Sequence, residues 1–288
     1  MTSPATARRL WALGEPYHAL NYFTDESLAA GQEAGLTGFW NGYFAFRAAP
    51  LGEVGAGAVT ATFYNFAPAF VARRVPAVWA AASPEAALGA RLAGVDAAVR
   101  RVLGEDWPRS AEAVEAAQLV SVAAAAVDAP GRPLAAANAA LPVPAEPHLA
   151  LWQGLTTLRE HRGDGHNAAL LEREVGGVAG HVLAVGAGRA DRAWLMRARG
   201  WDDAAWDAAA AGLTDRGLLD PAGGLTGEGR VLSAAVEADT DRLALAPWRA
   251  LGEAGCERLA ELLPPVRRAV SAAGAWPAGN PIGVPEPD

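Results

Sequence analysis

Helix start and stop signals run through this chain, whereas the strict polar–apolar alternation of a β-strand is absent before residue 225. Thr24, which precedes two acidic residues, predicts the start of a helix that ends near Gly35. Ser83 followed by Pro84 predicts another helix, which runs to about Leu103. The chain is therefore expected to be mainly α-helical.

All the basic residues are arginines, because the sequence contains no lysine. This excludes enzymes that use a lysine Schiff base, a lysine general base or the lysine of a phosphate-binding loop. The formal net charge of −8 argues against a general nucleic-acid binder or a protein of anionic membrane surfaces. With 288 residues, the chain can form one large domain or two modest ones.

A cytoplasmic location is expected from two features. The single cysteine, Cys256, cannot form an internal disulfide, which fits a reducing compartment. The first residues lack the apolar core of a signal peptide. The uncharged stretch 54–72 contains threonine, asparagine and proline, so it is expected to be a buried helix and not a membrane span.

The most polar stretch lies between two apolar helical segments and reads Arg159-Glu160-His161-Arg162-Gly163-Asp164-Gly165-His166. Glycines on both sides of one aspartate predict a hinge between two helices, where side chains from both helix ends converge. Imidazoles next to a carboxylate are typical of general acid–base catalysis. The predicted catalytic residues are His161, Asp164 and His166.

An anionic group on the substrate is expected from the arginines near this stretch, since guanidinium groups bind carboxylates through paired hydrogen bonds. Aromatic residues between positions 39 and 66 would line the pocket for a flat or apolar ligand. The predicted substrate-binding residues are Arg47, Tyr64, Arg159, Arg162, Trp40 and Tyr43.

A divalent metal is an alternative to metal-free chemistry. His18 and His148 each follow a proline at a predicted helix start, where the helix dipole favours the neutral imidazole that ligates metals. Together with His161 or His166 they would form a metal site. A third interpretation is purely structural, with arginine–glutamate pairs and Asp164 capping the helix that His166 begins.

The segment 199–245 contains the motif L-x-x-R-G-L-L from Leu213, a short turn at 220–224, the motif L-T-x-x-G-R from Leu225, and a long helix. In this order these features resemble a MarR-like winged helix. We therefore expect a helical domain at 1–188, then a winged helix-turn-helix domain with a small β-hairpin wing, together with a C-terminal helix, at 189–275. An extended proline-rich tail is expected at 276–288.

DNA binding is not expected from this module in spite of its resemblance. The segment holds four arginines against nine acidic residues, a local net charge of −5. Asp202 and Asp203 open the helix that would enter the major groove, where they would meet phosphates. The long helices at 229–242 and 253–273 could instead pair in a homodimer.

A set of short motifs is spread over most of the chain: Arg9-Leu10-Trp11, Glu15-Pro16-Tyr17-His18, Gly38-Phe39-Trp40, Tyr43-Phe44, residues 47–52, Phe63-Tyr64-Asn65-Phe66, residues 159–166 and Arg199-Gly200-Trp201. Through these motifs the chain as a whole resembles a helix-turn-helix family of GC-rich, actinobacterial-type bacteria. This resemblance implies a fold but no activity.

The sequence favours a small-molecule-processing enzyme with general acid–base or metal-assisted chemistry. Its substrate would be apolar or aromatic and would carry an anionic group. A ligand-sensing winged-helix transcriptional regulator and a non-catalytic small-molecule-binding protein are the alternatives. The expected partner is a small molecule, without a membrane.

Overall fold

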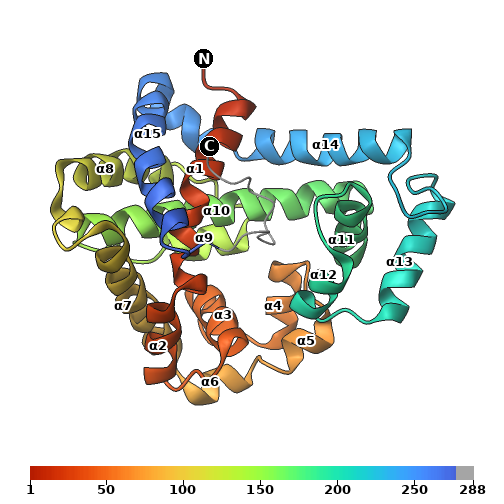
Figure 1. Cartoon of the computed structure of the whole chain (residues 1–288), viewed down its shortest axis with the longest axis horizontal. Helices are drawn as coiled ribbons and strands as arrows, with labels where there is room; N and C mark the ends of the chain where they lie inside the picture. The colour runs from red at the N-terminus through yellow and green to blue at the C-terminus, as the bar shows by residue number, and fades with distance from the viewer. Residues whose placement is uncertain (277–288) are drawn as a thin grey trace.

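The computed structural model describes residues 1–276, and these fold into α-helices joined by short loops (Figure 1). No strand occurs among these residues. The buried apolar side chains form three clusters, of which the first contains residues from both ends of the chain. The predicted mainly helical fold is confirmed.

The largest cluster joins helices from both ends of the chain. Its helices are α1 (Pro4–Phe23), α7 (Pro84–Leu103), α8 (Ala111–Ala125), α10 (Pro147–Glu172) and α15 (Ala246–Ala272), with the short 3-10 helix η2 (Trp107–Arg109) before α8. Helix α15 bends at Gly252, whose φ is +81°, and packs against α1 and α8. This core therefore contains residues from both sides of the predicted domain boundary at residue 188.

The second cluster is rich in aromatic residues and lies below the first in Figure 1. It is built by α3 (Phe39–Ala48), η1 (Ala49–Leu51), α4 (Ala56–Phe63), α5 (Pro68–Ala72) and α6 (Ala77–Ala81). Helix α2 (Asp25–Glu33) packs on α7 beside it, and α9 (Pro133–Ala139) contributes Leu134.

The third cluster lies at one end of the molecule. It is built by the last turns of α10 together with α11 (Gly177–Gly186), α12 (Arg192–Arg199), α13 (Asp203–Asp215) and α14 (Gly227–Leu243). Helix α14 runs alongside α10 and connects this end of the molecule back to α15 (Figure 1).

Helix α10 passes through the middle of the molecule and is buried on nearly all sides. The predicted hinge at Gly163–Gly165 is wrong, because both glycines lie inside this one continuous helix. At Gly165 the reason for glycine is close packing: an added Cβ would lie 2.9 Å from Nη1 of Arg132 and 3.1 Å from Cβ of Leu243. Glycine there lets α14 approach α10 and is not a sign of a flexible joint.

The predicted β-hairpin wing is also wrong. Residues 218–226 form a turn with only one isolated antiparallel bridge, between Leu219 and Leu225. The Asp220 side chain accepts hydrogen bonds from the backbone N–H groups of Ala222 and Gly224. These two N–H groups are bonded within the turn, and few residues flank it. A ladder of hydrogen bonds between two strands therefore cannot form.

The local helix signals are confirmed. Thr24 accepts a hydrogen bond from the backbone of Ser27 at the start of α2, and Ser83 does the same for Ala86 in α7. The uncharged stretch 54–72 is buried in part but forms two short helices, separated by Tyr64 at a φ of +46°. None of the helices in residues 1–276 combines the length and the apolar character needed to cross a membrane. The predicted tail lies outside the described residues, apart from Trp276.

Two alanine substitutions distinguish close packing from a hinge. We expect Gly163→Ala to stabilise the protein by about 0.5–1 kcal/mol, because its nearest neighbours leave room at 3.6 Å and helix interiors prefer alanine. Gly165→Ala should instead cost about 1–3 kcal/mol through overpacking against α14. Urea unfolding monitored by circular dichroism measures both changes. Equal effects of the two substitutions would contradict the packing explanation.

Candidate functional site

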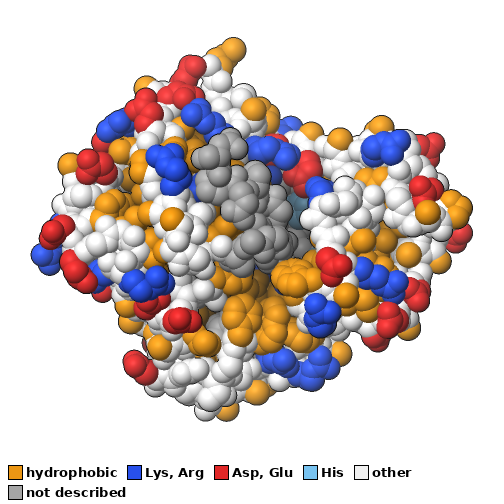
Figure 2. All heavy atoms as spheres, in the orientation of Figure 1, with side chains coloured by type: hydrophobic (Ala, Val, Ile, Leu, Met, Phe, Trp, Pro, Cys, Tyr) orange, Lys and Arg blue, Asp and Glu red, His pale blue; other side chains and the backbone are white. Residues whose placement is uncertain are grey.

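A cavity with a volume of ≈ 330 Å³ lies between four helices. We call it the main cavity. Four helices line it: α1, α3, α10 and α12. Figure 2 shows hydrophobic side chains, with arginines beside them, on the face between the aromatic cluster and the α11–α13 end. The lining residues are Tyr22, Phe23, Phe39, Trp40, Tyr43, Arg159, Trp194, Arg197, Ala198 and Arg199.

Helix α3 supplies one aromatic wall of the main cavity. Phe39, Trp40 and Tyr43 fall at positions i, i+1 and i+4, which share one side of a helix. Their rings touch one another, with centroids 4.9 Å apart for Phe39–Trp40 and 5.6 Å apart for Trp40–Tyr43. Tyr22 of α1 packs 4.8 Å from Tyr43. Rings held in this way present flat apolar surfaces to a ligand.

Arginine side chains form the opposite, polar wall. The guanidinium of Arg199 lies 4.7 Å from the ring of Phe66 and 5.9 Å from that of Trp194. Its one hydrogen bond is to the carbonyl of Ala198, and no carboxylate within residues 1–276 pairs with it. Burial lowers the pKa of Arg199, which reflects the cost of a charge without a counterion. The guanidinium of Arg199 is therefore available to bind an anion.

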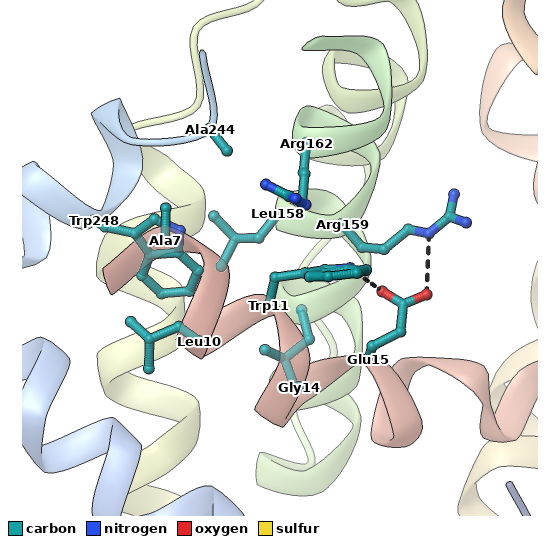
Figure 3. A pocket seen from close by; sticks show the side chains of 11 residues that line it. Ala7, Leu10, Trp11, Gly14, Glu15, Leu158, Arg159, Arg162, Ala244 and Trp248 are labelled. Carbon is teal, nitrogen blue, oxygen red and sulfur yellow. Dashed lines mark hydrogen bonds and ion pairs between the residues drawn. The ribbon is translucent and has the colours of Figure 1, made fainter. Parts of the chain in front are cut away.

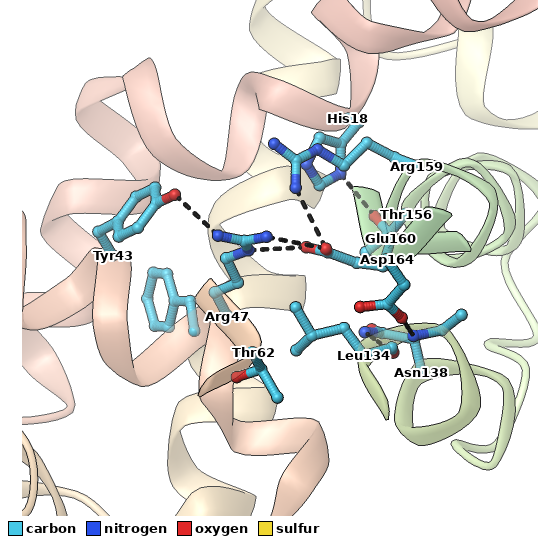
Figure 4. Close-up of polar contacts among 12 residues, drawn as sticks. His18, Tyr43, Arg47, Thr62, Leu134, Asn138, Thr156, Arg159, Glu160 and Asp164 are labelled. Atoms are coloured by element: carbon cyan, nitrogen blue, oxygen red, sulfur yellow. Dashed lines mark hydrogen bonds and ion pairs between the residues drawn. The ribbon is translucent and has the colours of Figure 1, made fainter. Parts of the chain in front are cut away.

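Arg159 reaches the main cavity from a buried ion network, shown in Figure 4. Glu160 binds Arg47 through two hydrogen bonds of 2.9 and 3.0 Å and Arg159 through one of 3.1 Å. Burial alone would raise the pKa of Glu160, but Arg47 and Arg159 outweigh it and lower the pKa to about 2. Arg47 also donates to the hydroxyl of Tyr43, at 3.4 Å. The network thus connects α10 to the aromatic wall.

Glu15 extends the ion network on the α1 side. Its carboxylate accepts from Nε of Arg159 at 3.4 Å and from the indole of Trp11 at 2.7 Å. Burial raises its pKa, and Arg159 only partly opposes this effect. Figure 3 shows the same residues beside a second cavity of ≈ 20 Å³, where Arg162 stacks on Trp11 at 4.5 Å. This space holds about one water molecule.

The three predicted catalytic residues are all on α10, but they do not line the main cavity. Asp164 accepts a hydrogen bond from the backbone of Ala135 in the first turn of α9, and burial raises its pKa to about 6. His161 is buried, and this burial lowers its pKa to about 4, with a further contribution from Arg132. His166 bonds to Thr240 of α14. His161 and Asp164 lie one turn apart, whereas His166 faces another helix.

The predicted substrate-binding residues divide into two groups. Trp40, Tyr43 and Arg159 line the main cavity. The others are engaged elsewhere: Arg162 binds Asp241 of α14 at 2.6 Å, and the Tyr64 hydroxyl donates to the carbonyl of Val175. The sixth, Arg47, lies behind the cavity and positions Glu160, as described above.

The two predicted metal ligands lie apart in the structure. Nδ1 of His18 is 2.9 Å from the hydroxyl of Thr156, and Nε2 of His148 is 2.6 Å from Asp96. Burial lowers the pKa of His18 well below its usual value, so it is neutral at pH 7. No group of three or more histidine, cysteine, aspartate or glutamate side chains with metal-site geometry occurs in residues 1–276.

Sequence reasoning missed the α12 wall of the main cavity. Trp194, Arg197 and Arg199 are separated from Arg159 by more than thirty residues, and only folding brings them together. A signal was present, because α12 carries three arginines and no acidic residue. Arg199-Gly200-Trp201 also stood among the residues that carry the family resemblance, without an assigned role.

Comparison with known proteins identifies the family. A model described as a helix-turn-helix family matches residues 7–277, which is most of the chain. The protein belongs to this helix-turn-helix family. No curated protein and no solved structure matches it.

Helices α12 and α13 are joined by a short turn. The solvent-facing side chains of α13 include Asp203 and Asp207, which are 81% and 68% exposed. Both bind the same guanidinium, that of Arg192 on α12, at 2.9 Å. Arg216, just after α13, donates to backbone carbonyls at the end of α10. The exposed surface of α13 is therefore acidic.

Removing the central carboxylate should destabilise the site. We expect Glu160→Gln to lower the free energy of unfolding by ~3–5 kcal/mol, because it leaves the buried Arg47 without a counterion and Arg159 with Glu15 alone. Glu15→Gln is the matched control and should cost less, since the raised pKa of Glu15 shows that its charge is poorly compensated. Chemical denaturation of both variants measures the difference. A cost for Glu15→Gln that equals that for Glu160→Gln would contradict this account of the network.

Proposed function

We propose that this member of the helix-turn-helix family binds a small aromatic organic anion in the main cavity. The observation that carries the proposal is the guanidinium of Arg199, which pairs with no carboxylate in residues 1–276 and lies at a cavity walled by aromatic rings. The volume lies within the range of about 300–1,000 Å³ that is common for ligand pockets. The ligand is of the kind predicted from the sequence, an aromatic compound with an anionic group. Its polar contacts would come from the arginines of α10 and α12.

The charges around the main cavity support an anionic ligand. Glu15 and Glu160 form ion pairs with Arg47 and Arg159. Neither carboxylate pairs with Arg199, and Arg197, which also lines the cavity, adds another positive charge. A ligand carboxylate would supply the missing charge and accept hydrogen bonds from the guanidinium N–H groups.

We propose binding in preference to catalysis. Of the residues predicted to transfer protons, Asp164 is bonded to α9 and His166 to α14, and neither these two nor His161 line the main cavity. The side chains that do reach it are arginines, which stay protonated, together with aromatic rings and the hydroxyls of two tyrosines. This set of groups recognises and holds an anion.

A ligand-sensing regulator is the second candidate, and membership in the helix-turn-helix family favours it. The surface of α13 argues against direct DNA reading, because Asp203 and Asp207 would meet phosphates. In our proposal α12 forms a wall of the binding site, and α13 supports α12.

Calorimetric titration with a matched pair of compounds tests the binding proposal. We expect 2-naphthoate to bind and 2-naphthalenemethanol, which has the same rings without a charge, to bind more weakly. Arg199→Met should weaken naphthoate binding about 10- to 100-fold, the contribution of a charge-assisted hydrogen bond, and leave the alcohol unchanged. Arg249→Met, at an exposed arginine of α15, is the control. Equal affinity for acid and alcohol would refute the proposal.

A mobility-shift experiment separates the two candidates. At about 100 mM salt, where screening beyond about 10 Å leaves direct contacts decisive, we expect no specific binding to the promoter region of the protein's own gene. A variant with Asp203→Arg and Asp207→Arg should gain salt-dependent, non-specific binding and serves as a positive control. Sequence-specific, nanomolar binding by the unmodified protein would instead establish the regulator.

A further inference from the structure

A third cavity lies behind the aromatic wall of the main cavity. It has a volume of ≈ 20 Å³ and shares the rings of Tyr22, Phe39 and Tyr43 with the main cavity. We call it the Asn21 cavity, because the side chain of Asn21 lines its far side. Its volume is that of about one water molecule or one hydroxyl group.

Asn21 is the unusual residue in this small cavity. The side chain is only 2% exposed, and its Oδ1 has no hydrogen-bond partner among residues 1–276. A buried amide without a partner costs free energy, so such groups are rare unless something outside the chain satisfies them. On α1, Asn21 comes directly before Tyr22, so one helix turn presents an amide to the small cavity and a ring to the main one.

Gly42 of α3 also lines the Asn21 cavity. This glycine is buried, yet an added Cβ would meet no atom within 4 Å. Glycine here is required neither by its backbone conformation nor by close packing. It leaves an empty space next to an unsatisfied amide.

We infer that the Asn21 cavity is a subsite for a hydroxyl or amino group on the distal end of the ligand. The inference rests on the proposed function. The ligand anion would lie against Arg199 and its rings between the aromatic walls. The distal polar group would pass between Tyr22 and Phe39 to bond with Asn21. Phe39 is 38% exposed, so its ring can turn without breaking a closed core. The ligand class is therefore an aromatic acid with a polar substituent opposite the acid.

Calorimetric titration of the full-length protein with 2-naphthoate and its distal-ring hydroxy isomers tests the subsite. One isomer should bind about tenfold more tightly than 2-naphthoate, the effect of one hydrogen bond. In Asn21→Leu, which keeps the side-chain size, this gain should disappear while 2-naphthoate binds as before. Gly42→Ala should likewise abolish the gain by filling the space, and it should fold well because alanine favours helices.

The outcomes separate the two proposals. If 2-naphthoate binds but no hydroxy isomer gains affinity, or the gain survives both substitutions, the subsite is overturned and the proposed function stands. In that case Asn21 binds a water molecule only. If 2-naphthoate itself does not bind, the proposed function falls and the subsite with it.

Discussion

The contact between Glu160 and two arginines holds the centre of this protein together. Glu160 is 1% exposed, and its ion pairs join α10 to α3 through Arg47 and orient Arg159 toward α1. Charges buried in a medium of low dielectric must be compensated, and their geometry is correspondingly fixed. The position of the aromatic helix α3 relative to α10, and hence the shape of the main cavity, follows from this contact.

The same network explains why the cavity is cationic. Each arginine of the network is needed to satisfy Glu160, but together with Arg199 they exceed the two carboxylates nearby. The nearby buried Asp164 accepts a hydrogen bond from the backbone of Ala135, and no acid among the described residues pairs with Arg199. The positive charge of Arg199 therefore stays beside flat apolar rings, which is the combination that recognises an aromatic acid.

Sequence reasoning predicted the features that depend on neighbouring residues. The caps at Thr24 and Ser83 and the aromatic side of α3 follow from local patterns, and the structure has them. The hinge at Gly163–Gly165 was wrong because glycine has two uses, and only tertiary contacts distinguish freedom from close packing. Arg199 could not be paired with Arg159 for the same reason. Their proximity depends on how α12 packs, which no local pattern encodes.

Helix α12 connects the cavity to the acidic helix α13. On one side Arg192 binds Asp203 and Asp207, and near the other end Arg199 borders the main cavity. Between the helices, Gly200 packs against Phe70 and the indole of Trp201 donates to the carbonyl of Asn65. The segment that leads into α13 is therefore held by the loop that follows α4 and by α5. The segment between α12 and α13 is thus already held at two points. An anion bound to Arg199 would therefore first stabilise the position of α13 and would not move it.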